Sequence, residues 1–163
     1  MSAPWSDPAV VIVTGIQASG KSTIGRLLSE KLERAAFIDG DALSRMVVRG
    51  RTGMTPDPSA EAVSELHLRY RQAALLAESF HDAGFTAVMA DNINGEDLAH
   101  QVGRICSSPL IVVVLAPRNE SVVARELARR TDAYRDWMRD QTLEAAVVEF
   151  QGYLAATPRI GFG

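Results

Sequence analysis

The fold is decided by the stretch Gly15-Ile16-Gln17-Ala18-Ser19-Gly20-Lys21-Ser22. It has the spacing G-x-x-x-x-G-K-S, follows an apolar run at residues 9–14 and precedes a helical pattern. A loop in this context turns its backbone N–H groups toward anionic oxygens at a helix N-terminus, and its glycines allow an approach that side chains would block. The stretch therefore predicts a site for the phosphates of a nucleotide, in preference to an ordinary glycine turn.

The residue types in this loop indicate their roles. We expect Lys21 to reach the β- and γ-phosphates and the Ser22 hydroxyl to bind Mg²⁺. The residues that we expect to bind the nucleotide are those of the loop and one arginine from a later helix, namely Gly15, Ala18, Ser19, Gly20, Lys21, Ser22, Thr23 and Arg130.

The composition limits the class of protein. The 163 residues suit one domain, and a net charge of -3 gives no basic field for nucleic acid. No apolar stretch is long enough to cross a membrane, and residues 1–8 lack the features of a signal peptide. The single cysteine, Cys106, fits a reducing cytoplasm, and we expect its side chain to be buried. We therefore expect a cytoplasmic monomer or homodimer without nucleic-acid or membrane partners.

Strands and helices alternate along the chain. Short apolar, β-branched runs predict strands at residues 9–14, 35–38, 85–90 and 110–115. Helical spacing predicts helices at residues 21–34, 43–51, 60–82, 117–130, from a cap at Asn94, and before Pro158. In the first of these helices we expect one apolar face, made of Ile24, Leu27, Leu28 and Leu32. The alternation predicts an α/β fold with a parallel sheet, helices on both faces, and ligands at the carboxyl ends of the strands.

Three carboxylates lie just after predicted strands and should gather beside the phosphate loop. We expect Asp41 to be the base that orients an acceptor hydroxyl, the alternative being a cap for the helix that begins near residue 42. Asp39 could hold Mg²⁺ or organise the turn. Asp91 has the position of a Mg²⁺ ligand but could instead bind a substrate hydroxyl, and Asn92 beside it could face the same cleft.

Arginines form two clusters, although a surface position is an equal alternative for any one of them. Those at residues 45–71 should lie on the substrate side, and those at 125–130 should act as a lid over the transferring phosphoryl group. We expect the catalytic residues to be Asp41, Lys21, Arg125 and Arg129. The expected substrate contacts are Asp39, Arg45, Arg49, Arg69, Asp91 and Asn92, and the expected metal ligands are Ser22 and Asp91.

Together these motifs resemble the P-loop small-molecule kinases. The similarity points to the group around chloramphenicol phosphotransferase and other antibiotic-modifying kinases, with adenylylsulfate kinase, gluconate kinase and zeta toxins as relatives. It rests on G-I-Q-A-S-G-K-S-T at 15–23, F-I-D-G-D at 37–41 with Arg45, A-D-N at 90–92, and V-L-A-P at 114–117 followed by an arginine-containing helix.

The resemblance implies the sheet order 2-3-1-4-5, a base at Asp41 after the second strand, and an arginine lid with Arg125 and Arg129. The acceptor segment would span about residues 43–82 and the lid about 118–135 of a single domain, 1–163. The last strand and helix of the family are not matched by the sequence after residue 157.

The expected activity is transfer of the γ-phosphoryl group of ATP or GTP, with Mg²⁺, to a hydroxyl of a small molecule, and the resemblance implies an antibiotic, for instance a nucleoside antibiotic. Two alternatives remain open: a zeta-toxin-like nucleotide-sugar kinase, and a nucleoside monophosphate kinase whose acceptor phosphate is held by the arginines at 45–71. A GTPase switch is disfavoured, because neither N-K-x-D nor D-x-x-G is present where it would be required.

Overall fold

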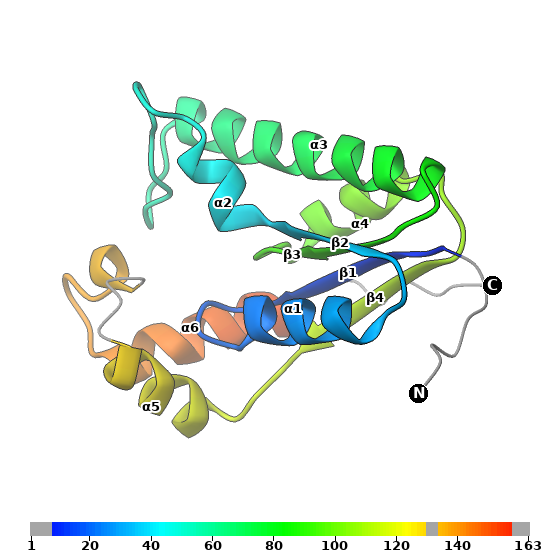
Figure 1. Ribbon diagram of the computed structural model, residues 1–163. Helices are drawn as coiled ribbons and strands as arrows, with labels where there is room; N and C mark the ends of the chain where they lie inside the picture. The colour runs from blue at the N-terminus through cyan, green and yellow to red at the C-terminus, as the bar shows by residue number, and fades with distance from the viewer. Residues whose placement is uncertain (1–7, 130–133, 158–163) are drawn as a thin grey trace.

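The computed structural model describes residues 8–129 and 134–157, and a parallel sheet lies at its centre (Figure 1). The four strands of the described residues are β1 (Val10–Gly15), β2 (Ala35–Asp39), β3 (Thr86–Ala90) and β4 (Leu110–Leu115), in the order β2-β3-β1-β4. This confirms the α/β fold and the first four positions of the expected order. Residues 158–163, with Pro158 and part of the expected fifth strand, lie outside the described residues.

Helices cover both faces of the sheet. Figure 1 shows α3 (Ala60–Asp82) and α4 (Glu96–Arg104) on one side, and α1 (Lys21–Lys31) on the other. The short α2 (Gly40–Arg45) leads from β2 toward α3, while α5 (Asn119–Arg129) and α6 (Leu143–Ala155) pack against each other. A 3₁₀ turn, η1 (Arg135–Trp137), lies between these last two helices in the sequence.

The core forms on both faces because side chains alternate along each strand. Val10 and Ile12 of β1 are fully buried against α3 and α4, whereas Val11 and Val13 face the side of α1. Small alanines on the buried face of α3 let this long helix lie close to the sheet. The phosphate loop is thus held at the end of the most deeply buried strand, at the carboxyl edge of the sheet.

The apolar face predicted for the first helix is wrong at two positions. Ile24 and Leu27 are 44% and 48% exposed, while Leu28 packs on the sheet. The reason lies at Gly25, which is buried against Phe37: a Cβ at this position would lie 2.7 Å from a carbon of the Phe37 ring. Close contact at the glycine leaves the neighbouring positions at the rim, where they meet solvent.

Three further local predictions differ from the structure. Cys106 is exposed, because it follows α4 in a turn whose N–H donates to the carboxylate of Glu78. The N-cap of α4 is Gly95 at φ 59°, not Asn94. The helix expected at residues 43–51 begins earlier, at Gly40, and ends at Arg45, so that the chain up to residue 59 is loop.

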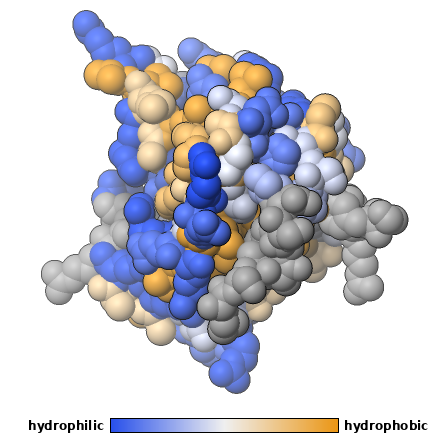
Figure 2. Space-filling model, turned by 45° about the vertical axis from the view of Figure 1, so that its right-hand side comes forward, coloured by the Kyte–Doolittle hydropathy of each residue, from blue (hydrophilic) through white to orange (hydrophobic). Residues whose placement is uncertain are grey.

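In the view of Figure 2 hydrophilic side chains dominate the surface, and apolar ones appear as separate patches. Single apolar side chains such as Val48 and Leu75 are exposed, as is usual at a protein surface. Among the described residues, no helix combines the length and the apolarity needed to cross a bilayer.

Candidate active site

The phosphate loop leaves β1 and returns into α1 through backbone conformations that suit its sequence. Gly20, the N-cap of α1, has φ 103° and gives the helix no side-chain cap. The first N–H groups of α1 are therefore available to anionic oxygens, where the helix dipole also favours negative charge. Gly15 could not carry a side chain, since a Cβ there would press against the carbonyl oxygen of Leu115.

Lys21 is buried at the base of this loop. Its Nζ donates to the carbonyl oxygen of Ile16 at 2.7 Å. Burial lowers the pKa of Lys21 to about 8, and the nearby charges of Asp91 and Asp41 oppose this shift. The Lys21 ammonium group is thus partly desolvated, and its electrostatic attraction for phosphate is stronger there than in water.

Helix α5, which contains the predicted lid arginines, contacts the loop directly. Arg125 donates from Nη1 to the carbonyl oxygen of Ser19 at 2.8 Å, and Arg129 lines the cavity in front of the loop. Arg130 lies outside the described residues.

A cavity of about 130 Å³ lies in front of the loop. It brings together residues that are far apart in the sequence, and most of them were predicted site residues. Its lining is Gln17, Ala18, Gly20, Lys21, Ser22, Asp39, Asp41, Ala90, Asp91, Asn92, Glu126 and Arg129. Of the predicted nucleotide contacts, Gly15, Ser19 and Thr23 do not line this cavity, although Gly15 and Ser19 shape the loop.

The two carboxylates after β2 have different roles in the structure. Asp39 is the N-cap of α2, and its Oδ1 accepts the backbone N–H of Asp41 at 3.1 Å. The capping role that the sequence left open for Asp41 therefore belongs to Asp39. The carboxylate of Asp41 is exposed and lines the cavity, so its oxygens can meet a hydroxyl group.

Asp91, at the end of β3, is buried and held by an arginine. Arg69 on α3 approaches it with Nε at 2.8 Å from Oδ2 and Nη2 at 2.9 Å from Oδ1. Burial raises the pKa of the Asp91 carboxyl, and the Arg69 guanidinium opposes this. Gly40 packs directly on this carboxylate, which leaves no room for a Cβ. The planar two-point contact fixes both side chains.

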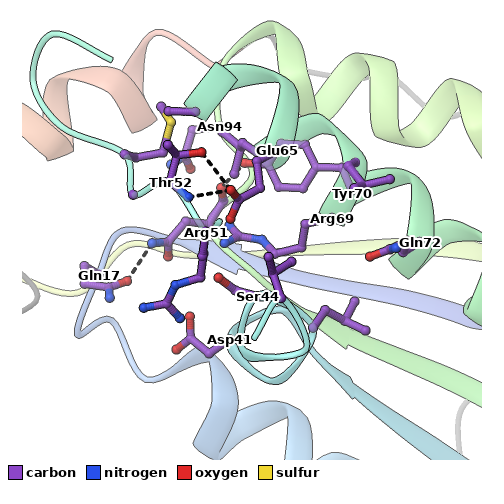
Figure 3. Close-up of a pocket in the computed structure, with 18 of the residues that line it drawn as sticks. Gln17, Asp41, Ser44, Arg51, Thr52, Glu65, Arg69, Tyr70, Gln72 and Asn94 are labelled. Carbon is purple, nitrogen blue, oxygen red and sulfur yellow. Dashed lines mark hydrogen bonds between the residues drawn. The ribbon is translucent and has the colours of Figure 1, made fainter. Parts of the chain in front are cut away.

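A second, larger cavity of about 380 Å³ adjoins the first (Figure 3). Its walls come from α2, the following loop, α3, η1 and α6. Gln17, Asp41 and Asn92 line both cavities, so the two spaces meet at these three side chains. Asn92 donates from Nδ2 to Oε1 of Gln17 at 2.6 Å, which ties the phosphate loop to the end of β3.

The loop after α2 is fastened over this second cavity. Both the N–H and the hydroxyl of Thr52 donate to Oε2 of Glu65 on α3, at 2.6 and 2.8 Å (Figure 3). These hydrogen bonds lower the pKa of Glu65, and the charges of Arg51 and Arg69 lower it further. The contact positions Arg51 at the cavity, whereas Arg45 and Arg49 are exposed and line neither space.

Several lining residues were missed by the sequence reasoning. Gln17 occupies one of the unspecified x positions of the loop motif. Its place in the lining of both cavities is evident only from the structure. Glu65 stands four residues before Arg69, so helical spacing alone could have placed both on one face of α3. Trp137 and Phe150 belong to no motif, and nothing in the sequence places them beside α2 and α3.

The oxygen atoms that line this cavity suit Mg²⁺, which commonly binds to protein, phosphate and water together. They suit a metal ion held by protein side chains alone less well. The Ser22 hydroxyl and the carboxylates of Asp39 and Asp41 line the phosphate cavity, while the oxygens of Asp91 are already held by Arg69. In the part of the chain that the structure describes, no three acidic, histidine or cysteine residues group as a metal site. Mg²⁺ commonly takes one or two protein ligands and completes its shell with water and phosphate.

The strand order and the loop at the end of β1 define the fold as that of the P-loop kinases. No protein-family model matches the chain. The chain is 29% identical over 111 residues to the bifunctional enzyme CysN/CysC of Rhodopirellula baltica. The aligned region covers 66% of this chain but only 16% of that protein.

Solved structures agree on the fold. A chain of the Pnkp1/Rnl/Hen1 RNA repair complex superposes with a TM-score of 0.66 at 15% identity, over 91% of this chain and 44% of that one. Shikimate kinase from Acinetobacter baumannii, in complex with shikimate, gives a TM-score of 0.57 at 18% identity, over 97% and 86%. The chain thus spans 16% of the CysN/CysC protein and 44% of the chain from the RNA repair complex.

Proposed function

We propose that this chain transfers the γ-phosphoryl group of ATP or GTP to a hydroxyl group of a small molecule. The observation that carries the proposal is the junction of the two cavities. A space lined by the phosphate loop opens at Asp41, Gln17 and Asn92 into a space of about 380 Å³, which is the size of a small-molecule site.

The residues around the junction suit phosphoryl transfer. The loop N–H groups and Lys21 hold the phosphates, and Asp41 accepts the hydrogen bond of the acceptor hydroxyl and orients its oxygen in line with the γ-phosphorus. Arg129 lines the same cavity and can meet the charge that spreads over the transferring group. When bound, Mg²⁺ would neutralise phosphate oxygens, and Ser22 with Asp39 or Asp91 would hold it directly or through water.

We further propose that the acceptor is an antibiotic and that phosphorylation of its hydroxyl inactivates it, a nucleoside antibiotic being one candidate. The motifs at residues 15–23 and 37–41 support this through their resemblance to antibiotic-modifying kinases. The reaction would take place in the cytoplasm, where nucleoside triphosphates are available and where a thiol such as that of Cys106 stays reduced.

The test measures ADP and GDP release by the full chain with Mg²⁺, over a panel of hydroxyl-bearing antibiotics, nucleosides, nucleoside monophosphates, nucleotide sugars and simple sugars. We expect acceptor-dependent release with at least one antibiotic. A product phosphorylated only on a nucleotide sugar or a nucleoside monophosphate would replace the antibiotic assignment with one of those activities. Absence of acceptor-dependent release across the panel, with nucleotide bound, would refute a kinase for these acceptor classes.

Asp41→Asn identifies the base. We expect turnover to fall by about 10²-fold or more while the affinity for nucleotide changes little, since the amide cannot accept the proton. Asp57→Asn, in the exposed loop before α3, is the matched control and should keep full turnover. Equal turnover in Asp41→Asn and Asp57→Asn would exclude Asp41 as the base.

A further inference from the structure

We infer that the acceptor is an uncharged, ring-bearing compound whose ring packs on an aromatic wall formed by Trp137 and Phe150. The inference rests on the proposed function, because it assigns the 380 Å³ cavity to the acceptor. It narrows the acceptor class by charge and by shape, and it disfavours phosphorylated and carboxylated acceptors.

The wall is a packed aromatic cluster. Phe150 of α6 lies between two other rings: its centroid is 5.1 Å from that of Trp137 and 5.2 Å from that of Tyr134, the latter at 84°. The Tyr134 contact is edge-to-face and the Trp137 contact is tilted at 59°, and both help to fix the orientation of the Phe150 ring. Trp137 and Phe150 are only partly buried and both line the acceptor cavity, so part of each ring remains free for a ligand.

This cluster is anchored to the phosphate loop. Tyr134 is fully buried, and its hydroxyl donates to the carbonyl oxygen of Gln17 at 2.8 Å. Gln17 in turn lines both cavities. A ring that packs on Trp137 is therefore held at a fixed place relative to the point where the γ-phosphoryl group would be delivered.

Other parts of the cavity lining are also apolar. Side chains from α2, the following loop and α3 contribute Leu43, Val47, Met54 and Leu66. Together with Trp137 and Phe150, these apolar groups provide a favourable place for a hydrophobic ring and a poor one for a polyhydroxylated or highly charged body.

The charges around the cavity cancel. Two arginines line it, Arg51 and Arg69, together with two carboxylates, Asp41 and Glu65. Arg69 is further engaged by the buried carboxylate of Asp91 through two contacts below 3 Å. Recognition of an anionic acceptor is favoured by an excess of guanidinium groups over carboxylates, and the lining of this cavity has no such excess. Arg45 and Arg49, which could have served this purpose, line neither cavity.

Four matched probes test charge and ring separately. Phenylethane-1,2-diol carries a ring and no charge, mandelate a ring and a carboxylate, propane-1,2-diol neither, and lactate only the carboxylate. Affinities for the full chain are measured by saturation-transfer NMR. In Trp5→Phe, Trp137 is the one remaining tryptophan, so its ¹⁵N indole signal reports binding at the wall.

We expect phenylethane-1,2-diol to bind about tenfold or more tightly than each of the other three probes, and to shift the Trp137 indole signal. Mandelate or lactate binding as tightly as its neutral partner would overturn the charge argument. Equal affinity of the two neutral probes, or no indole shift with either ring probe, would overturn the aromatic wall.

Substitutions test whether the preference for a ring comes from Trp137. Trp137→Ala should remove most of the advantage that the ring gives to phenylethane-1,2-diol, and Trp137→Phe should restore much of it. Phe80→Leu, which changes an aromatic residue outside both cavities, should leave all four affinities unchanged. These measurements need no turnover, so a kinase that failed them would still release ADP in the acceptor screen, and the two proposals can fail separately.

Discussion

We expect that replacing the loop lysine by methionine stabilises the nucleotide-free protein, although it abolishes the proposed binding of phosphate. Lys21 is buried, and burial lowers its pKa from the ordinary value of 10.5 to about 8. At 1.36 kcal/mol for each factor of ten, holding this charge in the folded protein costs about 3 kcal/mol at pH 7. Methionine has a similar length and no charge, so Lys21→Met removes that cost.

Part of this gain in stability is offset by the loss of a hydrogen bond. The hydrogen bond from Nζ to the Ile16 carbonyl oxygen disappears, and leaving a buried acceptor without its partner costs about 1–2 kcal/mol. The expected net effect is an increase in the free energy of unfolding of about 1–2 kcal/mol, which corresponds to a rise in Tm of about 3–6 °C for a chain of this size.

Thermal unfolding at pH 7, with and without Mg-ATP, measures this. Without nucleotide, Lys21→Met should melt above the wild type. With Mg-ATP at about 100 times its Kd the wild type should gain about 2.7 kcal/mol and the variant almost nothing. Lys31→Met is the control, because Lys31 is the other lysine of the chain and is exposed in the last turn of α1. It should be neutral or slightly destabilising.

The pH dependence of the unfolding free energy tests independently whether charged Lys21 destabilises the folded protein. Because the pKa of Lys21 is lower in the folded protein, the unfolded chain binds more protons between about pH 8 and 10.5, and this residue makes the wild type more stable as the pH rises through that window. The advantage of Lys21→Met should therefore shrink there. If Lys21→Met melts below the wild type at pH 7, the reasoning that burial of the charged lysine destabilises the folded protein is refuted.

Two further substitutions test the supports of the site. Gly40→Ala should destabilise the protein by about 2–3 kcal/mol in urea unfolding, because its Cβ would meet the Asp91 carboxylate and displace it from its arginine; Gly103→Ala, in open space on α4, should be stabilising instead. Thr52→Val loses the hydroxyl bond to Glu65, and we expect the acceptor KM to rise about fivefold while the nucleotide KM stays constant. An unchanged acceptor KM would show that the loop is held in place without this bond.

The sequence predicted the fold wherever a local signal was strong. The helix at 60–82 and the strand at 110–115 coincide with α3 and β4, because a side-chain cap at Ser59 and a continuous β-branched run leave little choice. The apolar residues Ile24 and Leu27 were misplaced because burial on α1 is decided by how closely Gly25 approaches Phe37. That distance belongs to the packing of two elements and has no local signature.

That the loop and the strand-terminal carboxylates line one cavity was predictable for the same reason. A loop motif and strand-terminal carboxylates act through the topology of the sheet, which the alternation of elements predicts. The acceptor side was not, because its lining comes from α2, a long loop, α3, η1 and α6, whose mutual placement depends on tertiary packing. Arginines 45, 49 and 69 look alike in the sequence, yet only Arg69 reaches the cavity.

Asp91 shows how one such contact sets the charge of both cavities. Its carboxylate opposes the effect of burial on Lys21 and so helps to keep that side chain protonated for phosphate. The same carboxylate holds Arg69 with both oxygens and removes a free guanidinium from the acceptor side. Without it, the loop cation would be weaker and the acceptor cavity would favour anions. Asp91, which the sequence predicts as a ligand of Mg²⁺ or of the substrate, therefore also influences the charge on both sides of the site.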